Sequence, residues 1–91
     1  MKITHVAVKY RGKIYSLPSP NRHHHVIWKI AEENGLTPDN PPTGIYGKNQ
    51  GFLDEEGNYL TRKQAHKIAL ESGQALPSAK IRDELFSEDL W

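Results

Sequence analysis

A chain of 91 residues has room for one domain, residues 1–91, because a second hydrophobic core does not fit in so short a sequence. Hydrophobic residues make up 36% and charged residues 25%, which favours a folded domain, and the absence of cysteine excludes disulfides and thiolate sites. A net charge of +1 excludes a protein that coats long nucleic acid through its phosphates. Residues 1–50 carry most of the positive charge, so a local basic pocket for a small anion stays open.

Nothing in the sequence predicts targeting to or across a membrane. The longest apolar run is far below the ~20 residues that cross a bilayer, and the first residues lack the apolar block of a signal peptide. A small domain without disulfides suits a reducing compartment. We therefore expect a cytoplasmic protein with no membrane partner.

An alternating pattern predicts a β-hairpin at the start of the chain. Residues 3–10 alternate between two faces and are rich in β-branched side chains, as is typical of a strand. Gly12 allows a tight turn, and residues 13–17 return as a second strand. Pro18 then ends the hairpin, because proline has no N–H to donate to a sheet.

A helix is predicted over residues 22–34, with Asn21 as its N-cap and Gly35 as its stop signal. Four apolar residues recur at helical spacing and indicate its buried side: Val26, Ile27, Ile30 and Ala31. Residues 36–48 follow as a loop rich in proline and glycine. It is longer than ordinary connections, so it is either a functional flap or a mobile segment.

A second hairpin and a second helix come next. Residues 51–53 and 58–60 flank a turn that contains Gly57. Thr61 and Gln64 have the spacing of a capping box, in which each side chain bonds to the backbone N–H of the other. The helix that they open runs to about residue 72, where a glycine ends it.

Residues 77–91 form a tail, with a short helix expected around residues 79–85. Four large apolar side chains near its end cost ~1.5–3 kcal/mol each if they stay in water, so we expect them to dock on this chain or on a partner: Leu85, Phe86, Leu90 and Trp91. A small core and an apolar tail also favour a homodimer. The predicted fold class is α+β, with two β-hairpins each followed by a helix (ββα–ββα) and a docked C-terminal tail.

Three consecutive histidines stand directly after Arg22 at the start of the first predicted helix. Ligands that hold one metal ion from a helix lie three or four positions apart, whereas adjacent side chains diverge by about 100°. His23, His24 and His25 therefore do not form a metal site as a set. We predict no metal and no other cofactor.

The same segment suits anion binding and acid–base chemistry. A helix N-terminus offers free N–H groups and partial positive charge, and Arg22 adds two parallel donors for phosphate. Two imidazoles can divide proton removal and proton donation in phosphodiester cleavage without a metal. We predict His23 and His24 as base and acid in either order, with a lysine of the first hairpin, Lys13 or Lys9, stabilising the developing charge.

A purely structural interpretation competes with this one. His23 shares its helical stripe with Val26 and can be a hydrogen-bonded core histidine, while His24 and His25 can be solvated. Because the adjacent side chains of His23 and His24 diverge, it also stays open that His5 or His66 takes the role of one of them as base or acid.

Further candidate ligand-binding side chains lie near the ends of predicted elements. Their polar groups suit a base or a phosphate, but equally a helix cap or a solvated position: Gln50, Arg62 and Gln74. The rings of Tyr46 and Trp28 can stack on a nucleobase, although Trp28 equally suits the core. Residues 87–89 either orient a histidine through a carboxylate or form an acidic surface turn.

Three segments together resemble a family of small bacteriophage and prophage proteins. They are Leu17-Pro18-Ser19-Pro20-Asn21-Arg22-His23-His24, the pattern Gln50-Gly51-Phe52-Leu53 with Gly57, Arg62 and Gly73-Gln74, and the terminal Leu85-Phe86-Ser87-Glu88-Asp89-Leu90-Trp91. In that family the third position of the histidine run is often Asp, and the residue before Ala65 is often Glu. This chain has His25 and Gln64 there.

The resemblance implies a phage protein, and small phage proteins of this kind include inhibitors of bacterial immunity that sequester or cleave nucleotide second messengers. Arg22, His23 and His24 match its polar motif best. The leading hypothesis is a metal-independent phosphodiesterase acting on a cyclic oligonucleotide such as 3′,3′-cyclic GMP-AMP. Its alternatives are a sponge that holds a cyclic nucleotide or an ADP-ribose derivative between subunits, and a protein-binding inhibitor anchored by the apolar tail.

Overall fold

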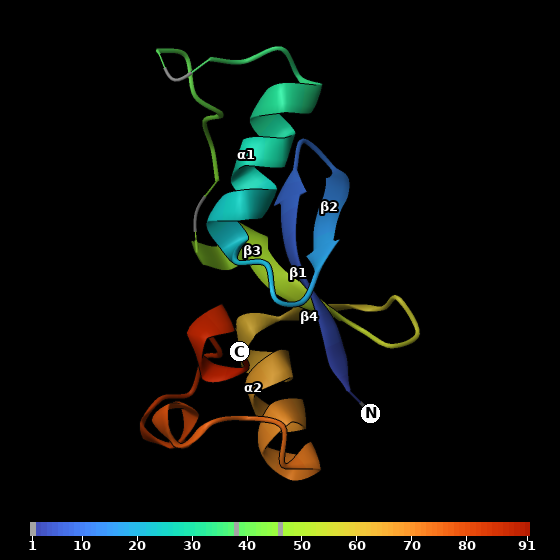
Figure 1. Cartoon of the computed structure of the whole chain (residues 1–91), viewed down its shortest axis with the longest axis vertical. Helices are drawn as coiled ribbons and strands as arrows, with labels where there is room; N and C mark the ends of the chain where they lie inside the picture. The colour runs from blue at the N-terminus through green and yellow to red at the C-terminus, as the bar shows by residue number, and fades with distance from the viewer. Residues whose placement is uncertain (1, 38, 46) are drawn as a thin grey trace.

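A computed structural model describes residues 2–37, 39–45 and 47–91 and confirms the α+β class with the order ββαββα (Figure 1). The strands and helices are β1 (Ile3–Tyr10), β2 (Lys13–Pro18), α1 (His23–Glu33), β3 (Gln50–Asp54), β4 (Tyr59–Thr61) and α2 (Arg62–Ser72). Three short 3₁₀ helices complete the described chain: η1 (Gly47–Asn49), η2 (Pro77–Ile81) and η3 (Ser87–Asp89).

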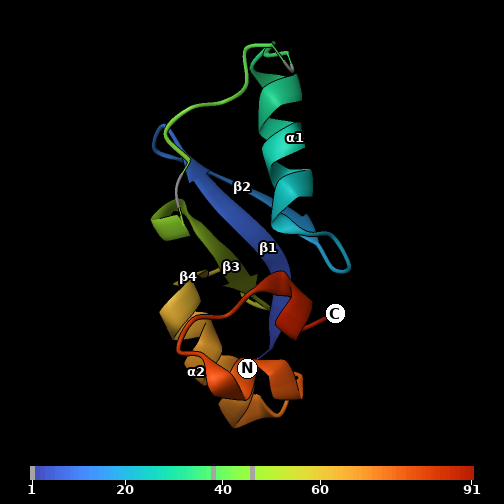
Figure 2. The same cartoon turned by 90° about the vertical axis from the view of Figure 1, so that its left-hand side faces the viewer.

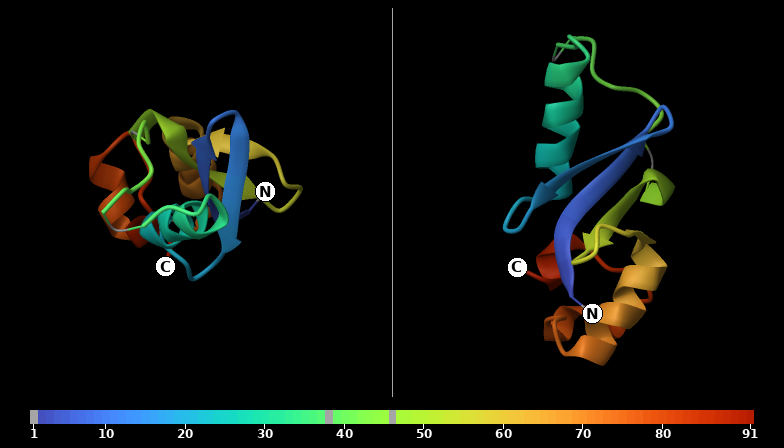
Figure 3. Two further views of the ribbon diagram at one scale, coloured as in Figure 1. Left: turned by 90° about the horizontal axis from the view of Figure 1, so that it is seen from above. Right: turned by 90° about the vertical axis from the view of Figure 1, so that its right-hand side faces the viewer.

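The four strands form one antiparallel sheet in the order β2–β1–β3–β4. Val6 of β1 lies opposite Leu17 of β2 and Phe52 of β3, so these side chains share the face that bears the core. Figures 2 and 3 show α1 along the upper part of the sheet and α2 below it. Both helices contribute to a single core, with Val26 and Ala65 among their fully buried residues.

Gly51 lies on the opposite face, at a position where the sheet has no room for a side chain. It pairs with Ala7 of β1, and a Cβ added to it would stand 2.6 Å from the hydroxyl of Tyr59 and closer still to the carbonyl of Leu60. The ring of Tyr59 in turn carries the ammonium group of Lys9, 4.3 Å from its centre. The glycine thus permits a close approach between β3 and the side chain of Tyr59.

The predicted N-cap is confirmed for α2 and wrong for α1. The capping box of α2 is confirmed: the Thr61 hydroxyl accepts from the Gln64 N–H at 3.2 Å, and the Gln64 side chain accepts from the Thr61 N–H at 2.9 Å. The predicted N-cap of α1, Asn21, is wrong by one residue. Arg22 caps the helix, because the ring of His25 accepts its N–H at 2.8 Å while the Asn21 side chain donates to Pro18.

The tail docks on its own chain. Leu85 and Leu90 are buried in the core, and the indole N–H of Trp91 donates to the Asn21 carbonyl at 2.8 Å. The helix predicted around residues 79–85 is wrong, because the segment forms the 3₁₀ helix η2 and then extends from Arg82. Since the tail finds its contacts within the chain, it no longer requires a partner, and a homodimer stays a prediction.

The acidic segment at residues 87–89 is not the surface turn that one interpretation predicted. Ser87 and Asp89 are buried, and the Asp89 carboxylate accepts from the Ser78 hydroxyl at 2.7 Å and from the Phe86 N–H at 2.9 Å. It also forms an ion pair with Arg82. This buried carboxylate ties η3 to η2.

The long connection between α1 and β3 runs from the far end of α1 back to the sheet (Figure 1). Within it, Thr37 and Asn40 form an isolated β-bridge, and η1 lies directly before β3. In the described part of the chain, no helix has the length and apolar character needed to cross a bilayer.

Candidate functional site

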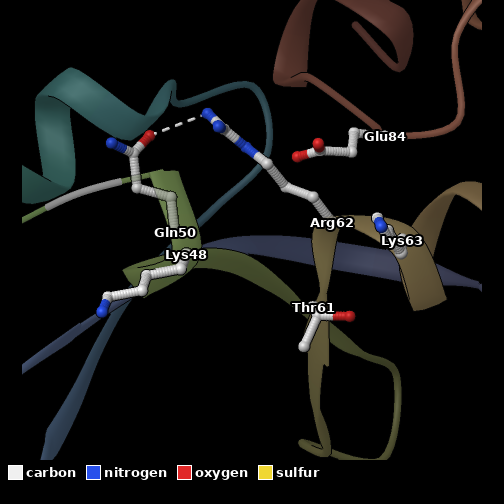
Figure 4. Close-up of a pocket in the computed structure, with 6 residues that line it drawn as sticks. All are labelled: Lys48, Gln50, Thr61, Arg62, Lys63 and Glu84. Atoms are coloured by element: carbon white, nitrogen blue, oxygen red, sulfur yellow. Dashed lines mark hydrogen bonds between the residues drawn. The ribbon is translucent and has the colours of Figure 1, made fainter.

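Two pockets adjoin each other where α1, β3 and α2 begin. The first, here called the α1 pocket, has a volume of about 360 Å³ and is lined by Arg22, His23, His24, Gln50, Arg62, Phe86, Ser87 and Glu88. The second, the α2 pocket, measures about 490 Å³ and is lined by Lys48, Gln50, Thr61, Arg62, Lys63 and Glu84 (Figure 4). Their common wall is formed by Gln50 and Arg62.

The topology explains why residues distant in sequence meet here. Arg22 and the histidines stand at the start of α1, Gln50 at the start of β3 and Arg62 at the start of α2, and these three ends face the middle of the molecule (Figures 1 and 2). The tail adds the remaining wall of the α1 pocket, residues 86–88. Five of the residues predicted as a site are therefore brought together: Arg22, His23, His24, Gln50 and Arg62.

Two arginines give the α1 pocket an excess of positive charge. Nη1 of Arg22 and Nε of Arg62 are both sealed from solvent and have no hydrogen-bond partner among the residues that the structure describes. A buried donor of a charged group without a partner costs about 1–3 kcal/mol or more. Glu88 is the one acidic residue in the described lining, so the lining holds two guanidinium groups and a single carboxylate.

Arg62 is held in place by contacts that do not involve its Nε. Its Nη2 donates to the side-chain oxygen of Gln50 at 2.9 Å, and Figure 4 shows that contact beside the Glu84 carboxylate, which is directed toward Arg62. Its guanidinium carbon lies 4.8 Å from the centre of the Phe86 ring, and that of Arg82 lies 4.6 Å from the same ring. Phe86 therefore orders two cations at once.

His23 is buried, and among the described residues only one of its two ring nitrogens has a hydrogen-bond partner. Its Nε2 donates to the Gly51 carbonyl at 2.7 Å, since a carbonyl only accepts, and its ring meets the edge of Phe52 at 5.0 Å between centres. In the neutral ring Nδ1 is then the acceptor. Burial lowers the pKa of His23; the Gly51 bond opposes this shift, the Arg62 charge adds to it and Glu88 opposes it. His23 is therefore a neutral base at pH 7.

Acidification should destabilise the fold through His23. The unfolded chain takes up a proton near the ordinary pKa of 6.5, whereas the folded protein takes it up only at lower pH. The unfolded state then binds more protons, so the free energy of unfolding falls as the pH drops from about 7.5 toward the folded-state pKa. Urea unfolding across this range measures the slope. It should flatten in His23→Gln and persist in His24→Gln; a steep slope in His23→Gln contradicts the assignment.

His24 and His25 form an aromatic cluster with Trp28. Their ring centres lie 4.1 Å apart, and each ring meets Trp28 edge to face, at 5.0 Å from His24 and 5.4 Å from His25. Trp28 is 65% exposed, so its interpretation as a core residue is wrong. Of the three histidines in the run, only His23 and His24 line the α1 pocket, because the His25 ring serves the cap of α1.

Other predicted site residues lie elsewhere. Lys13 begins β2 beside the β1–β2 turn, which Figure 1 places far from the start of α1, and its ammonium group lies 4.8 Å from the Tyr15 ring. The Gln74 side chain accepts from the Ile3 N–H at 2.9 Å and donates to the Ile3 carbonyl at 2.7 Å, so it holds the end of β1. Tyr46 lies outside the described residues.

The two remaining histidines are also placed away from the pocket lining. His5 pairs with Thr4 at 2.8 Å, and His66 donates to the Ala79 carbonyl at 2.7 Å. Within residues 2–37, 39–45 and 47–91, no three His, Asp or Glu side chains gather where one metal ion could bind them.

Sequence reasoning did not identify the tail as part of the site. Phe86, Ser87 and Glu88 line the α1 pocket, and Glu88 acts on the pKa of His23. The suggestion that residues 87–89 serve a histidine through a carboxylate was the one signal that pointed to this contact. Nothing local to the tail indicates which helix start it meets.

Comparison with known proteins identifies a family. A family model described as "Phage T4 y16D protein" matches residues 2–91. Neither a curated protein nor a solved structure matches the chain.

Proposed function

The chain belongs to the phage T4 y16D protein family, and on that premise we propose that it binds a small phosphate-bearing nucleotide signal of the bacterial host in the α1 pocket. The observation that carries this proposal is that Arg22 and Arg62 both line the α1 pocket, with Glu88 as the one acid in its described lining. Guanidinium groups match the oxygens of a phosphate and remain charged at any physiological pH. The start of α1 adds partial positive charge to the same pocket.

The size of the site favours a small molecule. Both pockets fall within the range of roughly 300–1,000 Å³ that is typical of small-ligand sites. A net charge of +1 does not favour the binding of a polynucleotide. Sequestration of the signal requires only these fixed donors, and it is the function that the geometry supports best.

A second function, cleavage of a phosphodiester in the signal, is favoured by the state of His23. A histidine that is neutral, oriented through Nε2 by a backbone carbonyl and open at Nδ1 has the properties of a general base. Nδ1 would take the proton of a 2′-hydroxyl, whose oxygen then attacks phosphorus. As the bond from phosphorus to the 5′-oxygen breaks, His24 donates a proton to that oxygen, and no metal takes part.

One experiment separates the two functions. The protein is incubated in EDTA with 3′,3′-cyclic GMP-AMP or with ADP-ribose, and bound and free material are analysed by chromatography after heat release. Sequestration returns the nucleotide unchanged. Cleavage yields a linear product that is lost in His23→Gln.

The controls follow from the placement of the cations. Arg22→Met should lose retention of the nucleotide, whereas Lys13→Met, a cation outside both pocket linings, should keep it. The proposal is wrong if neither compound is retained or cleaved and calorimetry detects no binding of inorganic phosphate.

A further inference from the structure

Trp28 lies at the surface beside His24, which lines the α1 pocket, and most of its indole stays exposed although it packs against His24 and His25. It is the most exposed aromatic residue among the large hydrophobic side chains of the described chain, at 65%, whereas the core side of α1 uses Val26 and Ile30. An exposed indole adds nothing to the core, and tryptophan is a favoured residue for stacking and for recognition. Its position therefore points to a ligand.

The cluster around Trp28 connects it to the pocket. His24 both lines the α1 pocket and meets the indole edge to face at 5.0 Å. Trp28 follows His24 by four residues, which places it one turn, about 6 Å, further along the helix. A ligand in the α1 pocket therefore has to extend past His24 to bring a second group to Trp28.

Resting on the proposed function, we infer that Trp28 is the stacking surface for the base of the bound nucleotide, while Arg22 and Arg62 hold its phosphate. The ligand is thus a nucleotide with an aromatic base rather than a sugar phosphate or a free phosphate. Stacking on an aromatic side chain accepts any of the bases, because each has a π face. The site then selects nucleotides as a class and leaves the choice among bases to other contacts.

Calorimetric titration with three probes tests this assignment: inorganic phosphate, ribose 5-phosphate and 5′-AMP. In the unmodified protein, 5′-AMP should bind about fivefold or more tightly than ribose 5-phosphate. In Trp28→Ala the two should bind equally, and inorganic phosphate should bind as before. Alanine favours a helix, so circular dichroism should report an intact fold. Ile81→Ala, at an exposed apolar residue in the tail, should leave all three affinities unchanged.

The titrations distinguish a failure of the stacking role from a failure of the proposed phosphate binding. If ribose 5-phosphate binds and 5′-AMP binds no better, the stacking role is wrong and phosphate binding stands; a tryptophan that serves a protein partner gives this result. If Trp28→Ala also loses inorganic phosphate, Trp28 supports His24 instead of a base, and the assignment fails. If none of the three probes binds to the unmodified protein, both the proposed function and this inference are overturned.

Discussion

Replacement of Arg62 by methionine should weaken the binding of 5′-AMP and inorganic phosphate by about 30-fold or more, and it should weaken the fold by less than this loss in binding free energy. The loss follows from truncating one partner of a buried, charge-assisted contact, which costs about 2–5 kcal/mol. The cost to the fold is limited to the Gln50 hydrogen bond and the charge over Phe86, because Nε of Arg62 has no partner in the described protein and methionine keeps an aliphatic stem over the ring. Calorimetry and urea unfolding measure the two effects separately.

Lys63→Met is the matched control for this experiment. Lys63 is the next residue on α2 and lines only the α2 pocket, so its loss removes the same charge from the protein and leaves the α1 pocket intact. We expect a change of less than threefold in affinity. If Arg62→Met lowers the stability by as much as it lowers the binding free energy, Arg62 is a structural residue and the pocket loses its main support.

The largest effect on stability should come from Asp89→Ala. The carboxylate of Asp89 is fully buried and accepts from Ser78, Arg82 and the Phe86 N–H. Although burial acts to raise the pKa of Asp89, these donors lower it, so the group is ionised and satisfied at neutral pH. Its removal leaves Arg82 and the Phe86 N–H without their acceptor, and we expect a loss of about 3 kcal/mol.

The same variant should affect binding, because Asp89 anchors the wall of the α1 pocket. Hydrogen exchange should accelerate at the Leu85 amide, which donates to the Arg62 carbonyl at 3.1 Å, and the affinity for 5′-AMP should fall with it. Asp83→Ala, at an exposed acid of the same tail, should change the stability by less than about 0.5 kcal/mol. Asp89→Ala with unchanged exchange at Leu85 would show that the tail is held by its apolar residues alone.

The parts of the fold that could be predicted are those that the sequence determines locally. Alternation predicted β1 and β2, and the Thr61–Gln64 capping box fixed the start of α2 to the residue. The predictions for the N-cap of α1 and for the tail were wrong, because a distant or unusual hydrogen-bond partner determines the local structure there. The N-cap of α1 shifted because His25 supplies an acceptor that capping statistics do not anticipate, and the tail avoids an α-helix while Asp89 fixes its shape from several residues away.

The candidate site divides in the same way. Residues at helix starts, such as Arg22 and Arg62, meet because the sheet topology brings those starts together, and their types already indicated an anion. Gln74 was placed among the ligand-binding candidates, but its partner is Ile3, at the other end of the chain. No pattern within a single segment reports such a pairing. The same holds for Phe86 and Glu88, whose role depends on where the tail docks.

The hydrogen bond between Gln50 and Arg62 lies in the wall that separates the α1 pocket from the α2 pocket. Rotation of the Gln50 side chain breaks this hydrogen bond, at a cost of about 1.5–3 kcal/mol and with no movement of the backbone. Since both pockets share Gln50 and Arg62 as a wall, we expect the loss of this bond to join them into one site for a ligand of two linked nucleotides. We expect a mononucleotide to leave the bond intact, so that the length of the ligand decides whether the two pockets join.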